Sequence, residues 1–551
     1  MSSIPLYFHT LKYLKFSQLY HRVLKKLKHP KPNYIQATRA PLKGKWFTQT
    51  LNQKKFLSDT DVCFLNHKGA VKDAADWNNS DQEKLWLYNL HYFDDLSSEH
   101  SESQQRLQKA WIEKWILENP PEKGGNGWES YTLSLRVVNW TKAFLSGLES
   151  NDEMLSSLAQ QADFLSQDLE KHLLGNHYFV NLKALIFAGC YFEGQEANGW
   201  LELALKDFEK ELKEQVLADG GSFELSPMYH AIMLTDLLDL INLFKAYPSR
   251  VPSGTIKLVE DLAVKMFIWL DKMSLGDDKI SFFNDSAFGI APSNETLKSY
   301  ATSLGINIPK LEMSEKHLDV YDLKQTGYVS VKTSSMNLIA DIAEVGPSYI
   351  PGHAHADTLS FELSLGKSRV FVNSGTSLYG ISEERLRQRG TAAHNTVVVN
   401  KTNSSQVWSG FRVAKRANVK NRFVKYSTCK SKVEFSGTQN GYIKQNIKCL
   451  HSRSWNVALN SLTITDTLSG KYDNATSYLH LHPDVQIIEY SPERCVLFSA
   501  NHKIELELVG GQLSVEESTW HPEFGISEKN QTLVIELMSS KLITNIQWTD
   551  L

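Results

Sequence analysis

The sequence predicts an α+β chain of two main parts, a domain of helical hairpins followed by an antiparallel β-sandwich. Between about residues 80 and 275, apolar residues recur every three or four positions, which is the period of amphipathic helices. After Gly327 apolar and polar residues alternate instead, which is typical of strands with one buried face. A chain of 551 residues is long enough for two to four domains with cores of their own.

Short breaker segments divide the helical part into pieces of the length of single helices. The breakers combine proline, glycine and asparagine, and they lie at residues 119–121, 124–127, 175–177 and 219–221. Helices joined by such short turns pack as antiparallel hairpins. Because each hairpin exposes an apolar face, the hairpins must curl or stack to cover it.

The β part is predicted from short alternating runs separated by glycine-containing turns. The runs lie at residues 328–332, 360–365, 396–399, 461–466, 503–508 and 532–537. Many short antiparallel strands of this kind favour a sandwich. We therefore divide the chain into a basic N-terminal arm at residues 1–75, a helical domain at 76–305, a linker at 306–326 and a β domain at 327–551.

The charge of the chain is balanced overall but not locally. The chain has 59 Lys and Arg against 62 Asp and Glu, a formal net charge of −3 at pH 7, which argues against a nucleic-acid-binding protein. The first 50 residues, however, contain ten Lys or Arg and no acidic residue. Such an arm favours peripheral contact with a membrane or an anionic glycan, and the alternative is a basic helix that faces solvent.

Other features limit the class of protein further. The five Cys show neither CxxC nor zinc-finger spacing, and no run reaches about 18 uninterrupted apolar residues, so we expect no disulfide framework and no transmembrane segment. The first residues lack the charged start and apolar run of a secretory signal. This predicts a cytoplasmic location by default and leaves a periplasmic or secreted one open. GxSxG, P-loop and HExxH motifs are absent from the sequence, and we expect no organic cofactor.

The first candidate site residues surround a glycine-rich breaker. Trp128 and Tyr131 lie in the segment GGNGWESY at 124–131, where aromatic side chains can stack on a sugar ring. Arg136, on the helix that follows, is of the type that binds carboxylates. Helix capping and core packing are the alternative explanation for each of the three.

A second candidate pair, Asn176 and His177, follows Gly175, where one helix ends just before the next begins. An asparagine amide can donate to a carboxylate without carrying charge. A histidine at this position can act as a base or as an electrostatic partner. The alternative is that Asn176 only caps the helix.

The segment from Glu224 to His230 leads into a third helix, which Pro227 is expected to begin. Tyr229 would then lie in the first turn and could present its hydroxyl to a cleft. Glu224 and His230 are candidate substrate-binding residues. The alternative for Tyr229 is a tyrosine packed in the core.

The fourth group is the segment PGHAHAD at residues 351–357. In an extended chain His353 and His355 point the same way, and together with Asp357 they can ligate a metal or form a His–carboxylate pair. The alternative is a chance cluster on the surface. Downstream candidates are Tyr379 and Arg389 for substrate binding and His394 as a third nitrogen ligand.

Taken in order, Asn176–His177, Tyr229 and the HxHxD segment at 353–357 resemble the heparinase II/III family of polysaccharide lyases. The resemblance extends over roughly residues 80–540 and includes WLYNLHYF at 86–93, HNTV at 394–397 and LHLHPD at 479–484. It implies an incomplete (α/α) toroid followed by an antiparallel β-sandwich. It also implies a carbon–oxygen lyase that cleaves an anionic, uronic-acid-containing polysaccharide, a glycosaminoglycan or exopolysaccharide, by β-elimination.

The resemblance also implies roles for the catalytic candidates. In β-elimination a base removes the C5 proton next to the uronate carboxylate, and an acid protonates the leaving O4. Asn176, assisted by His177 or His353, is expected to neutralise the carboxylate as negative charge builds up on it. Tyr229 is the expected acid and, in a syn elimination, also the base. His177 or His353 is the other base candidate.

Members of the family often carry a structural zinc, and the resemblance maps its ligands to His355, Asn373 and His394. Asn373 departs from the aspartate of the family pattern, and a neutral amide is a poorer zinc ligand than a carboxylate. If zinc is bound, we expect it to orient His353 rather than to take part in the chemistry.

Two other functions are compatible with the same residues. A uronate C5-epimerase shares the proton abstraction but returns a proton to the opposite face of the sugar. A non-catalytic glycan-binding protein of bacterial surface-polysaccharide assembly would keep the site without turnover. The sequence leaves open the polymer and linkage, endo or exo action, and the oligomeric state.

Overall fold

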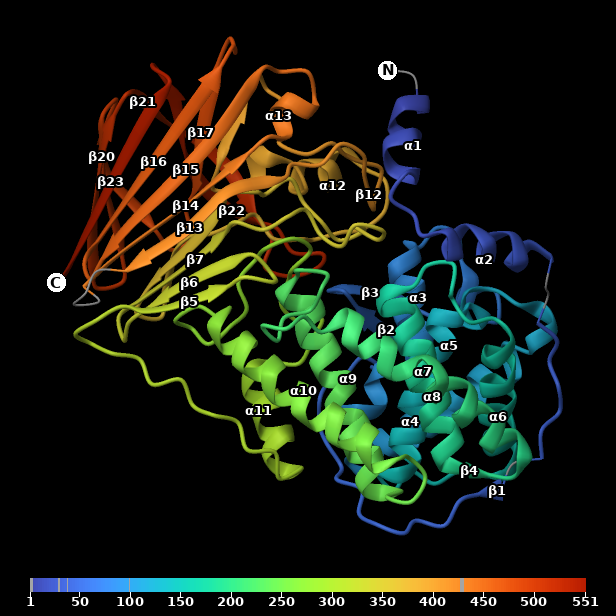
Figure 1. Ribbon diagram of the computed structural model, residues 1–551. Coiled ribbons are helices and arrows are strands. Elements are labelled where there is room, and N and C mark those ends of the chain that lie inside the picture. Colours follow the sequence, from blue (N-terminus) through green and yellow to red (C-terminus); the bar gives the residue numbers. More distant parts are fainter. Residues whose placement is uncertain (1–2, 28–29, 37, 99, 427–430) are drawn as a thin grey trace.

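The computed structural model describes residues 3–551 except 28–29, 37, 99 and 427–430. Figure 1 shows helices α2 to α11 gathered in one part of the molecule and the large sheets in the other, which also carries α12, α13 and the C-terminus. The helices are α1 Ser3–Leu11, α2 Phe16–Leu27, α3 Lys84–Tyr92, α4 Glu102–Glu118, α5 Ser130–Leu145, α6 Asp152–Gln167, α7 Gly175–Tyr191, α8 Gln195–Gln215, α9 Pro227–Ala246, α10 Ser253–Lys272, α11 Asn294–Ser303, α12 Glu383–Gln388 and α13 Gly441–Lys444.

Several helices of the first part begin at a side chain that caps the backbone. The caps are Ser101 before α4, Asn151 before α6, Ser226 before α9 and Ser293 before α11. Each accepts a hydrogen bond from the backbone N–H three residues later, which satisfies a donor that the helix itself leaves free. At α9 the cap is followed by Pro227 in the first helical position, so this start is fixed twice.

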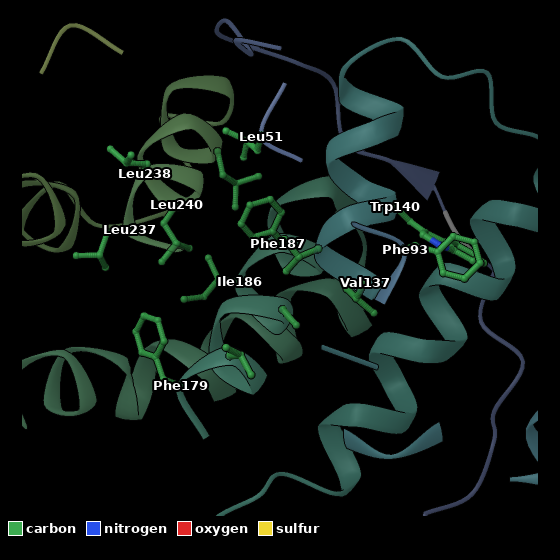
Figure 2. Close-up of a cluster of buried hydrophobic side chains, with 14 of the residues drawn as sticks. Leu51, Phe93, Val137, Trp140, Phe179, Ile186, Phe187, Leu237, Leu238 and Leu240 are labelled. Carbon is green, nitrogen blue, oxygen red and sulfur yellow. The ribbon is translucent and has the colours of Figure 1, made fainter. Parts of the chain in front are cut away.

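The core of the helical part is built around α7, most of whose side chains are buried. Figure 2 shows Ile186 and Phe187 of α7 among side chains from neighbouring helices, with Val137 of α5 and Leu240 of α9 in the same cluster. A helix that is covered on all sides needs no polar stripe, which explains why α7 is apolar almost throughout.

Part of the segment predicted as a basic arm belongs to this core. Leu51, Phe56 and Val62 are buried in the same cluster as the helices, with exposed fractions of 8%, 0% and 0%. Their apolar side chains, not the charge of the preceding residues, decide where they lie. α1 and α2 lie at the periphery of the molecule, and basic residues lie between them and within α2. At the other end of the domain α11 ends at Ser303, and the first strand of the β part begins at Asp319.

In the described residues, the β part contains three larger antiparallel sheets. The five-stranded sheet has the order β5 Asp319–Leu323, β6 Tyr328–Lys332, β7 Met336–Asp341, β8 Phe361–Leu365 and β9 Ser368–Phe371. The eight-stranded sheet has the order β13 Val419–Tyr426, β14 Lys432–Gln439, β15 Cys449–Ala458, β16 Ser461–Gly470, β23 Lys541–Asp550, β20 His502–Val509, β19 Arg494–Ser499 and β18 Gln486–Ser491. The four-stranded sheet has the order β10 Val397–Val399, β17 Ala475–His480, β22 Glu528–Leu537 and β21 Gly511–Trp520.

Short strand pairs complete the structure. They are β1 Thr38–Arg39 with β4 Phe192–Glu193, β2 Asp61–Phe64 with β3 His67–Ala70, and β11 Val407–Trp408 with β12 Arg412–Val413. Within the described ranges, no helix is long and apolar enough to cross a membrane.

The strands differ in burial according to their place in the sandwich. In β15 and β16 buried and partly exposed residues alternate, as expected for strands with one face in the core. In β6, β7 and β8 every residue is buried. One face contributes to the core shared with the eight-stranded sheet, and Tyr328 and Ile339 on the other join Trp269 of α10 in a second cluster. The predicted fold class, a helical domain followed by an antiparallel β-sandwich, is confirmed.

Candidate active site

Side chains from three distant segments meet where the first turn of α9 faces loops of the β part. The Tyr229 hydroxyl lies 3.0 Å from the hydroxyl of Tyr379. The Tyr229 ring stacks on the His353 imidazole, with 3.8 Å between the ring centroids. All three side chains are only partly buried, so this group of Tyr229, His353 and Tyr379 is accessible to a ligand.

The conformation of Tyr229 follows from the start of α9. The Ser226 hydroxyl accepts a hydrogen bond from the Tyr229 backbone N–H at 3.1 Å, which fixes Tyr229 in the first turn. Burial raises the pKa of the Tyr229 hydroxyl well above its usual value, and the neighbouring Tyr379 adds to this effect. At neutral pH the hydroxyl therefore carries its proton and can donate it.

His353 is oriented by a buried carboxylate, Asp285. The His353 Nδ1 lies 3.0 Å from Asp285 Oδ2, and Arg385 donates to the same oxygen at 2.7 Å. Burial alone would raise the pKa of Asp285, but the Arg385 charge and the hydrogen bonds hold it well below its usual value. Because Asp285 stays ionised, Nδ1 of His353 must be the donor, which leaves Nε2 as the proton-accepting nitrogen when the ring is neutral.

Asp285 and Arg385 were not among the residues predicted from the sequence. Both side chains are 0% exposed and form a buried ion pair. Their contacts join residues 68 and 100 positions apart, so no local motif marks them. The one available signal was a single charged residue, Asp285, within an otherwise uncharged and aromatic-rich run at 280–291.

Asn176 and His177 form the other side of the site, at the start of α7. Leu174 and Gly175 before them have φ angles of 64° and 58°, a left-handed pair that turns the chain sharply into the helix. Gly175 also approaches the Glu224 side chain, because a Cβ at this position would lie 3.5 Å from Glu224 Oε1. The turn thus brings Asn176 next to Glu224.

His177 is paired with a carboxylate and lies against Tyr131. Its Nδ1 is 3.3 Å from Glu170 Oε1, and its ring centroid is 4.6 Å from that of Tyr131. Burial would lower the pKa of His177, but the Glu170 charge and hydrogen bond outweigh it and raise the pKa above its usual value. His177 is therefore protonated more readily than a histidine without such a carboxylate partner. Glu170 was not among the residues predicted from the sequence.

Two polar groups on this side have unused hydrogen-bonding capacity. The buried Asn176 Oδ1 has no hydrogen-bond partner in the described part of the chain, and no described side chain donates to either carboxyl oxygen of Glu224. Glu224 is only 3% exposed. Burial raises its pKa above the usual value, although the His353 and His177 charges and the Asn176 backbone lower it. Buried polar atoms without partners are costly, so their presence here indicates a place prepared for a ligand.

Two residues predicted to bind substrate instead belong to the helical core. The Arg136 guanidinium is 0% exposed and donates to the carbonyl oxygens of His91 and Gly127. Trp128 is 6% exposed and donates from Nε1 to the Asn119 carbonyl. Their hydrogen bonds satisfy backbone groups at helix ends, so the expectation of sugar or carboxylate binding is corrected for both.

His230 and Arg389 are corrected in the same way. His230 is fully buried behind Tyr229, and its Nε2 lies 2.9 Å from the Met266 carbonyl. Arg389 is fully buried, with donor bonds to the carbonyl oxygens of Ala354 and Gly410. His230 thus connects α9 to α10, and Arg389 connects the loops that contain Ala354 and Gly410. Three of the predicted binding residues, Tyr131, Glu224 and Tyr379, do lie next to the catalytic candidates.

The three residues mapped to a zinc site do not complete one. His355 Nδ1 faces His394 Nε2 at 3.1 Å, as two ligands would. The Asn373 amide, however, accepts from the Asn395 N–H through Oδ1 and donates to the Phe282 carbonyl through Nδ2. Within the described residues, no group of three or more His, Cys, Asp or Glu could hold a metal ion. The neutral, fully bonded amide does not fit a zinc ligand, and we derive no catalytic step through a metal.

An (α/α) toroid followed by an antiparallel β-sandwich, with a tyrosine–histidine site at their junction, defines the class of this protein. The chain belongs to the heparinase II/III family. The description "Heparinase II/III N-terminus" matches residues 11–306, and "Heparinase II/III-like, C-terminal" matches residues 316–549. Both parts of the fold are therefore covered.

Known relatives agree with this assignment. The chain is 24% identical over 446 residues to a heparin-sulfate lyase of Bacteroides stercoris, covering 71% of this chain and 65% of that protein. It is 25% identical over 371 residues to one of Pedobacter heparinus, covering 59% and 53%. The chain thus spans between about half and two thirds of the length of these curated relatives. A crystal structure of heparinase III shares the fold, with a TM-score of 0.69 and 18% identity over 88% of this chain and 80% of that one.

Proposed function

We propose that this protein is a polysaccharide lyase that cleaves an anionic, uronic-acid-containing polysaccharide by β-elimination. The observation that carries the proposal is the Tyr229 side chain, whose ring stacks on His353 and whose hydroxyl lies 3.0 Å from Tyr379. Glu224 lies close enough to interact electrostatically with both His353 and His177, and so connects this group to Asn176 and His177. A proton donor and acceptor on one side and carboxylate-binding groups on the other are the two requirements of the reaction.

The carboxylate-binding side lowers the cost of removing the C5 proton. When C5–H breaks, its electron pair is delocalised onto the adjacent carboxylate, which gains negative charge. The Asn176 amide, a protonated His177 and a protonated Glu224 can each donate a hydrogen bond to that group. Donors that are already in place act most strongly on charge that develops in the transition state. The raised pKa values of His177 and Glu224 both favour the protonated, donating form.

The other side transfers the protons. The electron pair from C5–H forms the C4=C5 double bond, the C4–O4 bond breaks, and O4 takes up a proton. Tyr229, which keeps its proton at neutral pH, is the acid for O4. In a syn elimination its proton would first pass to His353, and the tyrosinate would then take the C5 proton and deliver it to O4. His353 can act as the base through Nε2, since Asp285 fixes the proton on Nδ1.

The test is digestion of a panel of uronate polymers, beginning with heparan sulfate because the relatives are named heparin-sulfate lyases. A lyase product contains a C4=C5 double bond conjugated with the carboxylate, so ultraviolet absorbance rises. Confirmed binding with no rise for any polymer would contradict the proposal. Deuterium incorporation at C5 without chain cleavage would identify a C5-epimerase instead.

Tyr229→Phe assigns the role of the hydroxyl. We expect kcat to fall by about 10²–10⁴-fold because a positioned acid–base group is lost, while polymer binding is kept. Tyr379→Phe is the matched control: it removes the neighbouring hydroxyl and should have a smaller effect. Full activity of Tyr229→Phe would refute the assignment.

A further inference from the structure

The helix α2 presents its apolar side away from the protein. Phe16, Leu19, Tyr20, Val23 and Leu27 recur at helical spacing and form one stripe, with exposed fractions of 82%, 45%, 52%, 60% and 72%. An amphipathic helix of a soluble domain normally buries such a stripe against the core. In α2 the stripe remains open.

The polar side of α2 is the side that contacts the protein. Gln18, 1% exposed, donates from Nε2 to the Leu173 carbonyl at 3.0 Å, and Lys25 pairs with Asp168 at 3.0 Å. These contacts hold α2 with its polar side toward the protein and its apolar side toward solvent.

The preceding helix, α1, repeats the arrangement on a smaller scale. Ile4, Phe8 and Leu11 are spaced by four and three residues and are 76%, 65% and 45% exposed. The other side contacts the β part, where Thr10 Oγ1 accepts from Trp408 Nε1 at 3.1 Å. Figure 1 shows α1 beside the β part and α2 beside the helical part, both at the periphery of the molecule.

We propose that these two stripes form a docking surface for an anionic lipid bilayer. Residues 3–27 carry Lys12, Lys15, Arg22, Lys25 and Lys26 and no acidic residue. Lys15 and Lys25 pair with Glu214 and Asp168, and the exposed Lys12, Arg22 and Lys26 accompany the apolar stripes. Exposed aromatic and aliphatic side chains next to lysines are the composition of helices that lie in a membrane interface, where burial and attraction to anionic lipids act together. Pairing with a second copy through the same surface would place the two basic segments face to face.

Docking would also place the candidate active site near the bilayer. Gln18 is bonded to Leu173, three residues before Asn176, so α2 lies directly beside the turn that leads into α7. The surface does not depend on the identity of the reaction, and it can be tested without any activity measurement.

The experiment is flotation of the full chain with vesicles of phosphatidylcholine alone or mixed with phosphatidylglycerol. We expect binding to the anionic vesicles that weakens as salt is raised, and little binding to the neutral ones. Phe16→Glu/Val23→Glu should reduce partitioning by at least about tenfold, because two apolar side chains that would enter the bilayer are lost and two negative charges are added. Leu117→Glu and Ile488→Glu, which replace residues 80% and 58% exposed on α4 and β18, are the matched controls and should bind like the parent.

Other outcomes decide against the proposal. Equal loss of binding in the control variants, or equal binding to both kinds of vesicle, would overturn it. A concentration-dependent dimer that the double substitution abolishes, with no vesicle binding, would assign the surface to a second copy of the chain. Circular dichroism of each variant ensures that the comparison is made on folded protein.

Discussion

The Tyr229–His353 side of the site and the Asn176–Glu224 side differ in how their polar atoms are satisfied. Behind the first side, the buried Asp285 accepts hydrogen bonds from Arg385, His353 and His355. On the second, Asn176 Oδ1 is unpartnered and no described side chain donates to the Glu224 carboxyl. The comparison indicates that the Tyr229–His353 side is held in place before substrate binds, while the polar atoms of the Asn176–Glu224 side are free to form hydrogen bonds with the substrate.

The largest expected effect is a loss of stability when the Asp285 network behind the Tyr229–His353 side is disrupted. Asp285→Ala leaves Arg385 charged and buried without its partner, so we expect the free energy of unfolding to fall by about 3–5 kcal/mol. Urea denaturation at neutral pH measures the change. The matched control is Asp261→Ala, which removes a pair with Lys257 whose side chains are 56% and 75% exposed. That change should cost less than about 1 kcal/mol. Equal effects of the two substitutions would show that the Asp285 network does not stabilise the site.

A substitution on the Asn176–Glu224 side should lower kcat and leave the free energy of unfolding almost unchanged. Asn176→Ala removes a donor to the substrate carboxylate, and we expect kcat to fall by about 10²–10³-fold. The free energy of unfolding should change by no more than about 0.5 kcal/mol, because the lost Oδ1 has no partner in the described part of the folded chain. Steady-state kinetics separate kcat from KM. A rise in KM with unchanged kcat would mean that Asn176 binds the ground state only.

Glu224→Gln gives a smaller effect on the free energy of unfolding, and its size depends on pH. The pKa of Glu224 is raised by burial, so ionisation opposes folding, and stability is lost as pH rises from the usual carboxyl pKa through the raised one. The substituted amide cannot ionise. The variant should therefore match the parent at low pH and exceed its stability at neutral pH, while its activity falls. Urea denaturation across this pH range measures the difference. A constant difference at all pH values would show that Glu224 is not the group that titrates.

The difference between local and long-range contacts explains how much of the fold and of the candidate site could be predicted from the sequence. The change in apolar period near Gly327 predicts the helical and β parts, and the helix start at Pro227 predicts the position of Tyr229, because both signals are local. Asp285 pairs with Arg385 across 100 residues, and such a contact leaves no local pattern.

Two arginines were wrongly predicted to lie in the site, for a related reason. Arg136 and Arg389 were expected to bind substrate, yet both donate to backbone carbonyls in the interior. In sequence, a buried arginine that satisfies carbonyl groups looks the same as one that faces a ligand. Asn176, His177 and Tyr229 escaped this ambiguity because each lies in the first turn of its helix, where side chains reach the end of the helical layer.

The smallest expected effect concerns the charge of His177. Glu170 raises the pKa of His177, so the cation that would neutralise the substrate carboxylate persists to higher pH and is lost as pH rises through that pKa. In Glu170→Gln the raising charge is absent, and the alkaline fall in kcat/KM should move to lower pH. The pH–rate profile measures this shift, and Asp207→Asn, which alters the partly exposed partner of Tyr178 and Lys171, is the control. An unchanged alkaline limb in Glu170→Gln would mean that another group titrates there, and the carboxylate-binding side would then rest on Asn176 and Glu224 alone.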